Sequence, residues 1–266
     1  MRIRDALGCE IEVEPPARRI VSLVPSLTEL VCFLGLGHTL AGVTRYCVEP
    51  PAVVDRLPKV GGTKNPDLQA ILRLHPDLIL ANAEENRRED VESLRRAGLR
   101  VFVTYPRSLR DVAQMVQEVG ALISSQARVQ NLVAQILAPH PGFEPQERPV
   151  RVFCPIWKNP WMSFNCDTYA HALLSCCGAL NAAHAEKERY PVVDLRTIAE
   201  FDPEIILLPD EPYRFSRKDV PELAPLAQTS AARSNRIYFV SGKALTWFGP
   251  RTAGARRYFA QFLSVI

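Results

Sequence analysis

The chain has 266 residues, of which 47% are hydrophobic and 23% are charged. This composition is typical of a packed globular protein and excludes a disordered one, and the length suits one large domain or two of about 100 to 150 residues. The formal net charge is only +3, from 32 basic and 29 acidic residues. Because no basic run stands out either, the sequence argues against a nucleic-acid-binding protein.

The amino terminus, MRIRDALGCEIEVEPPARRIVSL, has no apolar stretch of signal-peptide length, and four acidic residues interrupt it. No later segment approaches the run of about 18 apolar residues that indicates a membrane-spanning helix. The seven cysteines include no C-x-x-C pair, which fits free thiols in a reducing compartment. We therefore expect a cytoplasmic protein as the sequence is written, or a periplasmic or cell-surface one if the true start lies upstream.

The first half of the chain alternates strand and helix signals. In chain order these are a β-rich run, RRIVSLVP (18–25), an apolar helical segment, SLTELVCFLGLG (26–37), a short helix and strand in LQAILRLHPDLILA (68–81), and a further strand in LRVFVTY (99–105). Asp67 can cap the short helix, and the proline of HPD ends it because proline lacks an amide hydrogen. Strands that alternate with helices predict a parallel sheet with right-handed crossovers.

A long helix is predicted over residues 108–138, SLRDVAQMVQEVGALISSQARVQNLVAQILA. Its apolar residues follow helical spacing, Ser108 and Asp111 can form a capping box, and no proline intervenes before Pro139. About thirty residues at about 1.5 Å each give a rod of roughly 45 Å. A helix of that length is expected to be a strut that connects two bodies.

The second half repeats the design of the first. It has a β-rich run, VRVFCPIW (150–157), a helical segment, DTYAHALLSCCGAL (167–180), and a late strand, RIYFVSG (236–242). The phrase LQAILRLHPDLILANAEEN (68–86) has a near twin, LRTIAEFDPEIILLPDEPY (195–213), at an offset of 195 − 68 = 127 positions. The coinciding pairs are Leu68/Leu195, Ile71/Ile198, Pro76/Pro203, Ile79/Ile206, Leu80/Leu207 and Glu84/Glu211.

The repeat predicts two α/β lobes of related design. We expect an amino-terminal lobe over residues 1–107, the connecting helix over 108–138 and a carboxy-terminal lobe over 139–266. Each copy of the phrase ends its buried strand in a polar loop that carries a carboxylate. Since ligands bind beyond the carboxyl ends of parallel strands, both loops are expected to face a ligand cleft between the lobes.

The run RIVSLVPSLTELVCFLGLG (19–37), followed by L-x-P-D-L-I (74–79) and a backbone helix, resembles the helical-backbone metal-chelate receptors. These are the class III substrate-binding proteins of ABC importers, and the cobalamin-binding receptors are the most similar among them. The resemblance covers roughly residues 10–264. It implies two Rossmann-like α/β lobes joined by a single long backbone helix, with a metal-chelate ligand in the cleft and an ABC permease as partner.

The resemblance also shows where this chain departs from the cobalamin receptors. Their corrinoid is held largely by aromatic side chains, and three of those positions fall on Glu49, Thr63 and Asn82, while a fourth falls on Tyr190. This departure implies a more polar ligand or one in a different orientation. The surface glutamates through which the family docks on its permease correspond here to Gln69 and Arg196. An arginine at that position would repel arginines of a permease.

The candidate ligand-binding residues come from four kinds of signal. They are the loop residues after the repeated strands, the residues after the glycine pair of VGGTKNPD (60–67), tryptophans flanked by proline, glycine and polar residues, and positions that the resemblance implies, in TRYCVEPP (44–51) and at Tyr190. Partial exposure is expected for the tryptophans, and Arg251 can pair with a carboxylate. The full set is Arg45, Tyr46, Glu49, Thr63, Lys64, Asn65, Glu84, Glu85, Asn86, Trp157, Trp161, Tyr190, Glu211, Tyr213, Trp247 and Arg251.

Metal and catalytic motifs are not found in the sequence. The residues weighed as metal ligands are Cys47, Glu49, His171 and His184, but no H-x-x-x-H, H-E-x-x-H or C-x-x-C spacing exists. Neither G-x-S-x-G nor G-x-G-x-x-G is present. We therefore expect no intrinsic cofactor, no protein-built metal site and no enzyme activity.

Three other functions stay open. One is binding of an iron chelate, either a siderophore or haem, in place of a corrinoid. Another is a cytoplasmic cofactor-handling protein or enzyme on the same scaffold, which the missing signal peptide and the residues Gln69 and Arg196 favour. The third is a regulatory or interaction module whose cleft is vestigial.

Overall fold

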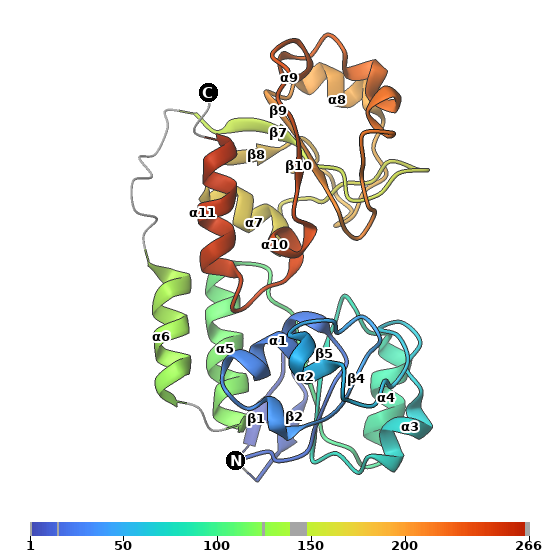
Figure 1. Ribbon diagram of the computed structural model, residues 1–266, viewed down its shortest axis with the longest axis vertical. Coiled ribbons are helices and arrows are strands. Elements are labelled where there is room, and N and C mark those ends of the chain that lie inside the picture. Colours follow the sequence, from blue (N-terminus) through green and yellow to red (C-terminus); the bar gives the residue numbers. More distant parts are fainter. Residues whose placement is uncertain (1, 15, 124–125, 139–147, 264–266) are drawn as a thin grey trace. The chain divides into compact units, whose positions relative to one another are not determined.

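The computed structural model describes residues 2–14, 16–123, 126–138 and 148–263 (Figure 1). The chain divides into two compact units. Unit 1 comprises residues Met1–Pro106 with Arg110–Leu137, and unit 2 comprises Arg107–Leu109 with Ala138–Ile266. Each unit is built around its own sheet, so each is described by itself.

Unit 1 contains a four-stranded parallel sheet in the order β4-β3-β5-β6. The strands are β3 (Ile20–Ser22), β4 (Leu40–Val43), β5 (Leu78–Asn82) and β6 (Val101–Thr104). Every residue of β3, β5 and β6 is buried, as expected for parallel strands covered on both faces. The remaining elements up to β6 are β1 (Arg2–Arg4), β2 (Glu10–Glu12), α1 (Pro25–Phe33), η1 (Gly37–Thr39), α2 (Pro51–Val54), α3 (Leu68–Arg73) and α4 (Arg88–Arg96).

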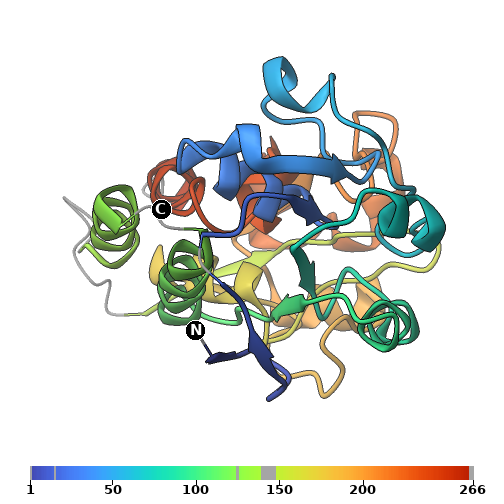
Figure 2. The same ribbon diagram turned by 90° about the horizontal axis from the view of Figure 1, so that it is seen from below.

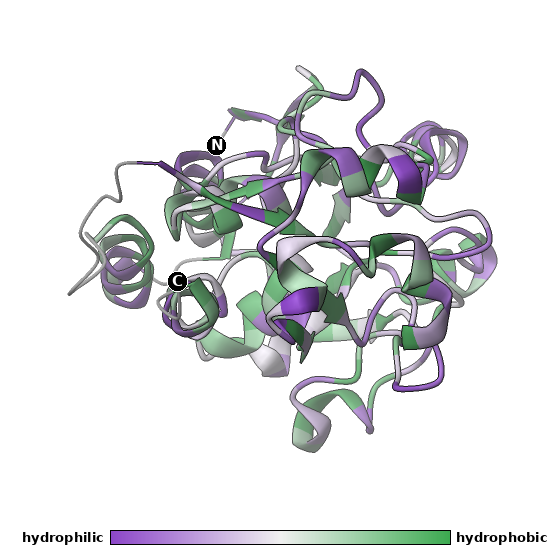
Figure 3. Ribbon diagram, turned by 90° about the horizontal axis from the view of Figure 1, so that it is seen from above, coloured by the Kyte–Doolittle hydropathy of each residue, from purple (hydrophilic) through white to green (hydrophobic). Residues whose placement is uncertain are grey.

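Unit 2 contains a second four-stranded parallel sheet in the order β10-β9-β7-β8. Its strands are β7 (Val150–Phe153), β8 (Ala179–Asn181), β9 (Ile205–Pro209) and β10 (Ile237–Val240). Its helices are α7 (Tyr169–Cys176), α8 (Leu195–Phe201), η2 (Val220–Leu226), α9 (Ser230–Arg233), α10 (Gly242–Thr246) and α11 (Thr252–Leu263). In Figure 3 the helices carry both hydrophilic and hydrophobic residues, which is typical of helices with one face on a core.

The repeated phrase forms the same structure in both units. Strand β9 begins and ends 127 positions after β5, and each helix before it begins at the matching leucine. Asp67 caps α3 by accepting the Ala70 N–H, and Asp194 caps α8 by accepting the Arg196 N–H. Both strands also hold the same place in their sheets, next to the strand of that sheet that comes first in the chain. The predicted fold of two α/β lobes with parallel sheets is therefore confirmed.

The segment predicted as one helix over 108–138 forms two helices, α5 (Leu109–Ile123) and α6 (Gln126–Leu137). A Cβ atom placed on Gly120 would lie 2.2 Å from Cγ2 of Val129, although nine residues of a continuous helix span about 14 Å. The chain therefore turns back, and α5 and α6 lie side by side (Figures 1 and 2). The sequence between them, Ser124 and Ser125, lies outside the described residues.

No helix within the described ranges is long and apolar enough to cross a membrane.

The close contact between α5 and α6 makes a stability prediction at Gly120. In one continuous helix, Gly120→Ala would stabilise by up to about 1 kcal/mol, because alanine is the better helix former. In the observed arrangement the new methyl group overlaps the Val129 side chain, so we expect a loss of about 1–3 kcal/mol. Urea unfolding of purified protein measures the change.

The double variant Gly120→Ala with Val129→Ala is the control, because it removes the overlapping side chain. A positive coupling between the two substitutions, of at least about 0.5 kcal/mol, is expected from their contact. If Gly120→Ala alone raised the free energy of unfolding, the packing of α6 on α5 would be contradicted.

Candidate functional site

The sheet order identifies one place in each unit where a ligand can bind. In unit 1, β3 connects to β4 on one side and β5 connects to β6 on the other, so the connections leave adjacent strands in opposite directions. Unit 2 has the same reversal between β7 and β9. Such a switch point opens a crevice at the carboxyl ends of the two strands. The loops after β3, β5, β7 and β9 are therefore the candidate sites.

Asn86 joins three loops at the switch point of unit 1. Its amide nitrogen donates to the carbonyl oxygens of Leu23, at 3.3 Å, and Thr63, at 3.0 Å. Its amide oxygen accepts the N–H of Asn82 at 2.9 Å. Asn86 is only 4% exposed. This predicted contact residue therefore acts in the described structure as a support that holds the surrounding loops.

Asn82 supports the loop that carries two of the candidate carboxylates. Its side-chain oxygen accepts the N–H groups of Glu84, at 2.9 Å, and Glu85, at 3.2 Å, and its nitrogen donates to the carbonyl of Thr104. The residue is 1% exposed. Asn82 therefore holds the Glu84–Glu85 loop in position and is too buried to contact a ligand.

A polar rim lies next to this loop and is formed by Arg45, Tyr46, Thr63, Lys64 and Asn65. The Arg45 N–H donates to the carbonyl of Gly61 at 2.8 Å, and the guanidinium lies 5.8 Å from the ring centre of Tyr46. The Lys64 ammonium donates to the Glu84 carbonyl, which joins the glycine loop to the β5 loop. Arg45, Tyr46, Lys64 and Asn65 are exposed, so the structure gathers predicted site residues of unit 1 at one edge.

Side chains of the rim lie close to the backbone at Gly62, so a Cβ atom there would require them to shift. A Cβ atom at Gly62 would lie 2.3 Å from the side-chain oxygen of Asn65 and 3.3 Å from the ring of Tyr46. The glycine pair thus allows Tyr46 and Asn65 to approach the same stretch of backbone, as glycine in such loops does.

Cys47 is not available to a ligand. It is fully buried, and its sulfur lies 3.1 Å from the hydroxyl of Thr28 and 3.2 Å from that of Thr44. Burial raises the pKa of the thiol, against smaller opposing effects of the hydrogen bonds from Thr28 and Thr44. Cys47, one of the residues weighed as metal ligands, is therefore buried and not exposed to a ligand in this structure.

An aromatic group marks the switch point of unit 2. Trp157, in the loop after β7, is 42% exposed, and its ring meets that of Tyr213 edge-on at 5.7 Å. Tyr213, in the loop after β9, also packs on Phe215 at 4.7 Å, and Trp161 stacks on Phe215 at 5.8 Å. The loops of two neighbouring strands are thus joined through rings, and Trp157 stays partly exposed to solvent.

Two further residues extend the apolar surface around Trp157. Met162 pairs with Trp157 on one side and with Val192 on the other, both in antiparallel bridges. Val192 is 64% exposed and Tyr190 is 40% exposed. The sequence analysis found Tyr190 but missed Met162 and Val192, because a single bridge leaves no periodic pattern in the sequence.

Lys158 holds Tyr213 of the aromatic group in place through Asp219. Its ammonium lies 2.6 Å from a carboxylate oxygen of Asp219, and that oxygen also accepts the Tyr213 hydroxyl at 3.1 Å. The Lys158 ammonium holds the pKa of the Asp219 carboxyl at about 2, and the Ser216 N–H and hydroxyl support the same charge. The orientation of the Tyr213 ring is therefore set by a charged hydrogen-bond network.

Trp247 is buried, with 8% of its surface exposed, and the predicted partial exposure is wrong for this tryptophan. The Lys243 ammonium lies 5.1 Å from its ring centre and the Arg251 guanidinium 5.2 Å, so two cations cover the ring. Its indole also makes a hydrogen bond with Glu211. A tryptophan flanked by glycine and proline in sequence can still be covered by long cationic side chains.

Glu211 is a half-buried carboxylate at the matching position to Glu84. Burial raises the pKa of its carboxyl, while the hydrogen bond from Trp247 and the charges of Lys243 and Arg251 oppose this shift. Backbone and side-chain atoms of Glu211 also pack on Gly242, where a Cβ atom would lie 2.4 Å from its carbonyl oxygen. Glu211 therefore bridges the loops after β9 and β10.

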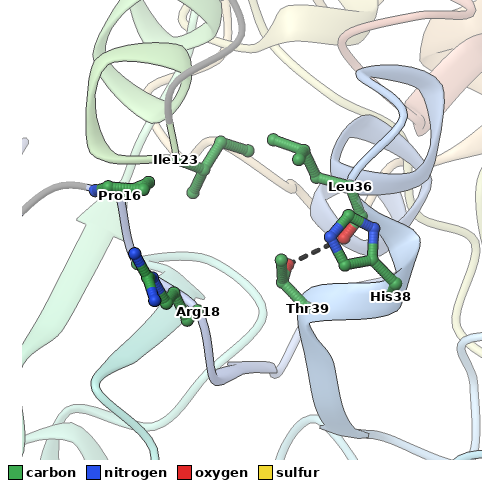
Figure 4. Close-up of a pocket in the computed structure, with 7 residues that line it drawn as sticks. Pro16, Arg18, Leu36, His38, Thr39 and Ile123 are labelled. Atoms are coloured by element: carbon green, nitrogen blue, oxygen red, sulfur yellow. Dashed lines mark hydrogen bonds between the residues drawn. The ribbon is translucent and has the colours of Figure 1, made fainter.

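One hollow lies at the opposite edge of the unit 1 sheet. It measures about 310 Å³ and is lined by residues before β3, by the turn between α1 and β4, and by the end of α5 (Figure 4). The hydroxyl of Thr39 donates to the Leu36 carbonyl there at 2.7 Å. None of the predicted ligand-binding residues lines this hollow. Its place at the amino ends of the strands separates it from the candidate sites.

Among the residues that the structure describes, no group of three or more His, Cys, Asp and Glu side chains could hold a metal ion. His171 and His184 lie near the start of α7 and after β8, and burial lowers the pKa of His171.

Comparison with known proteins agrees with this architecture. A family model described as "Periplasmic binding protein" matches residues 20–244, which is most of the chain and includes both sheets. The chain belongs to this family of periplasmic binding proteins. Proteins of this family are substrate-binding proteins, so a small-molecule ligand is expected of its members.

Relatives of this family member include a vitamin B12-binding protein of Vibrio cholerae, which is 24% identical over 94% of this chain and 90% of its own length. An uncharacterised ABC transporter substrate-binding lipoprotein of Bacillus subtilis is 25% identical over 94% of this chain and 81% of its own. Among solved structures, the apo periplasmic heme-binding protein RhuT of Roseiflexus sp. RS-1 has a TM-score of 0.79, with 23% identity over 93% of this chain and 99% of that one.

Gln69 and Arg196, the positions matched to permease-docking glutamates, lie on the first turns of α3 and α8, and both are exposed. The repeat places them at equivalent positions of the two units. These surfaces are therefore open to a partner, but neither carries a carboxylate at that position.

The half-buried carboxylate of Glu211 makes a prediction about stability and pH. Because its pKa is raised in the folded protein, the folded state favours the protonated form, and the related stability is lost as pH rises through the folded pKa. Glu211→Gln removes the ionised form while its carbonyl can still accept from Trp247. We expect the melting temperature of this variant to exceed the wild-type value at pH 7, with a smaller difference at pH 4.

Glu211→Ala is the matched control, because it also removes the acceptor for the Trp247 indole. It is expected to have a lower melting temperature than the Gln variant at both pH values. The expected difference in the free energy of unfolding is about 1 kcal/mol. A Gln variant less stable than wild type at pH 7 would show instead that attraction to Lys243 and Arg251 outweighs the cost of burial.

Proposed function

We propose that this chain binds a metal-chelate ligand, with a cobalamin-like corrinoid preferred, as the substrate-binding protein of an ABC importer. The observation that carries the proposal is the exposed ring of Trp157, held by Tyr213 at the switch point of unit 2. A planar macrocycle offers a broad apolar face, and aromatic rings stack on such faces favourably.

The relatives support a metal chelate over other small molecules. The Vibrio cholerae relative is named for vitamin B12, and the solved structure from Roseiflexus is named for heme. Both are flat macrocycles around a metal ion. The shared chemistry is thus a ring system with an apolar face, and the corrinoid is favoured because the curated relative covers nearly the full chain.

The polar rim of unit 1 argues for a ligand with many polar substituents. Arg45, Lys64 and Asn65 supply donors, while Glu84 and Glu85 supply acceptors. A corrinoid carries amide groups around its ring, which can pair with both kinds of side chain. Contacts from Thr63, Glu49, Tyr190 and Trp161 are part of the same proposal.

Binding without catalysis is the simpler function for these sites. In both candidate sites the buried polar side chains Asn82, Asn86 and Asp219 are occupied in supporting loops. The alternatives are an iron chelate, a siderophore or haem, in the same site, and a cofactor-handling role. Gln69 and Arg196, which would not pair with arginines of a permease, favour the second alternative.

For the location we propose the periplasm or the cell surface, one of the two expectations drawn from the sequence. The names of the relatives describe periplasmic proteins and a lipoprotein. The partner would be an ABC permease whose surface opposite α8 tolerates or attracts the positive charge of Arg196.

Titration with hydroxocobalamin, followed by tryptophan fluorescence, tests the proposal. We expect saturable quenching with a Kd of about 1 µM or below, and a Kd about three- to tenfold weaker for Trp157→Ala, because one stacking face contributes about 0.5–1.5 kcal/mol. Isothermal calorimetry measures the same Kd for the variant that lacks this fluorophore.

Phe239→Ala is the matched control, since Phe239 has the same exposed fraction of 42% but lies on the edge strand β10. Its Kd is expected to equal the wild-type value. Quenching by Fe(III) protoporphyrin IX but not by hydroxocobalamin would select the iron-chelate alternative. A response to neither probe contradicts the proposed function.

A further inference from the structure

Cys176 and Cys177 are the one place in the sequence where two cysteines are adjacent, and both are free thiols. They lie at the carboxyl end of α7, where Cys176 is the last helical residue and Cys177 is the cap. A hydrogen bond joins the two thiols. Cys176 is partly exposed, whereas Cys177 is buried. A thiol that is open to reagents is therefore in direct contact with a second, buried thiol.

Arg256, on the neighbouring helix α11, contacts both thiols. Its guanidinium makes a hydrogen bond with Cys176, and its carbonyl accepts the S–H of Cys177 at 3.4 Å. The guanidinium also donates to the Ala138 carbonyl at 2.6 Å, which holds it in place. Helices α7 and α11 lie side by side within unit 2 (Figure 1). The packing of these helices thus brings a fixed cation to the thiol pair.

The two thiols differ in how readily they ionise. The hydrogen bond with Cys177 lowers the pKa of the Cys176 thiol, burial opposes this effect, and the charge of Arg256 and its hydrogen bond lower the pKa further. The pKa of Cys177 is raised, first by the hydrogen bond with Cys176 and then by burial. Because the thiolate is the nucleophile and the thiol is not, Cys176 is the residue that attacks first.

The other cysteines lack this combination of exposure, a cation and a second thiol. Cys47 and Cys154 are fully buried, and burial raises the pKa of both thiols. Cys9 is partly exposed and lies 3.1 Å from the Arg95 guanidinium, but no cysteine is near it in the sequence. Cys166 is exposed and has no adjacent cysteine, so it is a suitable reference thiol.

The end of α7 suits a reversible bond between the two sulfur atoms. Gly178 follows with a φ of 89°, a conformation that glycine adopts without strain, so the helix ends directly after the pair. Adjacent Cα atoms are about 3.8 Å apart, which is closer than the roughly 4.4–6.8 Å of ordinary disulfides. A disulfide between adjacent cysteines is therefore strained and easily reduced, as labile disulfides are.

We propose that Cys176 and Cys177 are a site of reversible thiol–disulfide exchange with low-molecular-weight disulfides such as oxidised glutathione. The Cys176 thiolate attacks one sulfur of the small disulfide, so that a mixed disulfide forms at Cys176 and one small thiolate leaves. Cys177 then loses its proton to water and attacks the Cys176 sulfur, and the second small thiolate leaves. The two protein thiols are oxidised to one disulfide, the small disulfide is reduced to two thiols, and these take up the two protons. This site goes beyond the proposed function and does not depend on which ligand the chain binds.

Mass spectrometry after incubation with oxidised glutathione tests the proposal. Trypsin leaves Cys166, Cys176 and Cys177 in one peptide, residues 159–187, so Cys166→Ser is the background in which this peptide keeps only the adjacent pair. Folded protein is incubated, quenched in acid, alkylated with N-ethylmaleimide and digested. We expect the peptide to lose the mass of two hydrogen atoms and to escape alkylation. Reduction with dithiothreitol before alkylation is expected to restore both thiols.

Two variants in this background separate the steps. In Cys177→Ser no thiol resolves the mixed disulfide, so we expect about tenfold more peptide that carries one glutathione at Cys176. In Cys176→Ser the remaining thiol is buried, so the peptide is expected to stay reduced. In the wild-type chain, Cys166 is expected to form only a mixed disulfide, because it has no adjacent cysteine.

Three results would overturn the proposal. They are a peptide that stays reduced in the folded Cys166→Ser background, a mixed disulfide that persists there at the level of Cys177→Ser, and modification of Cys177 in Cys176→Ser. Melting temperatures of the reduced variants control for folding. A serine variant that melts well below its background is replaced by alanine at the same position, and the same three results then decide.

Discussion

Parallel pairing of β3 with β5, and of β7 with β9, is the constraint on which the rest of the structure depends. Because both strands of each pair end at the same edge, four loops that are distant in sequence are brought to two places. The reversal of strand order at each pair keeps crossover helices away from these loops. Residues as far apart as Leu23 and Asn86 can then form one hydrogen-bonded support.

The two units use this common frame for different chemistry. In unit 1 the loops are held by asparagine side chains and present arginine, lysine and glutamate to solvent. In unit 2 they are held by rings and by the Lys158–Asp219 pair, and they present Trp157 and Val192. Position 84/211 keeps a glutamate in both, but Glu211 is covered by Trp247, Lys243 and Gly242. A duplicated scaffold has thus acquired one polar and one aromatic edge.

The sequence predicts what depends on local chemistry. Apolar runs, proline and the repeat predict the places of β5 and β9 and of the loops that carry the candidate residues. They also predict the helix caps at Asp67 and Asp194. It does not predict what depends on packing across the chain. The contact of Gly120 with Val129 and the covering of Trp247 by cations come from residues brought together by folding. Apolar spacing alone cannot distinguish one long helix from two that pack on each other.

Two groups at the carboxyl edge of unit 2 lower the stability of the fold that holds them. Glu211 has a carboxylate whose pKa burial raises, and Trp157 a ring of which 42% is exposed. Local departures from good packing and pairing gather at functional sites, where a ligand compensates for them. Their location at the switch point of unit 2, where a ligand is expected to bind, favours the proposal that this edge contacts a ligand over the view that it is a remnant of a duplicated scaffold.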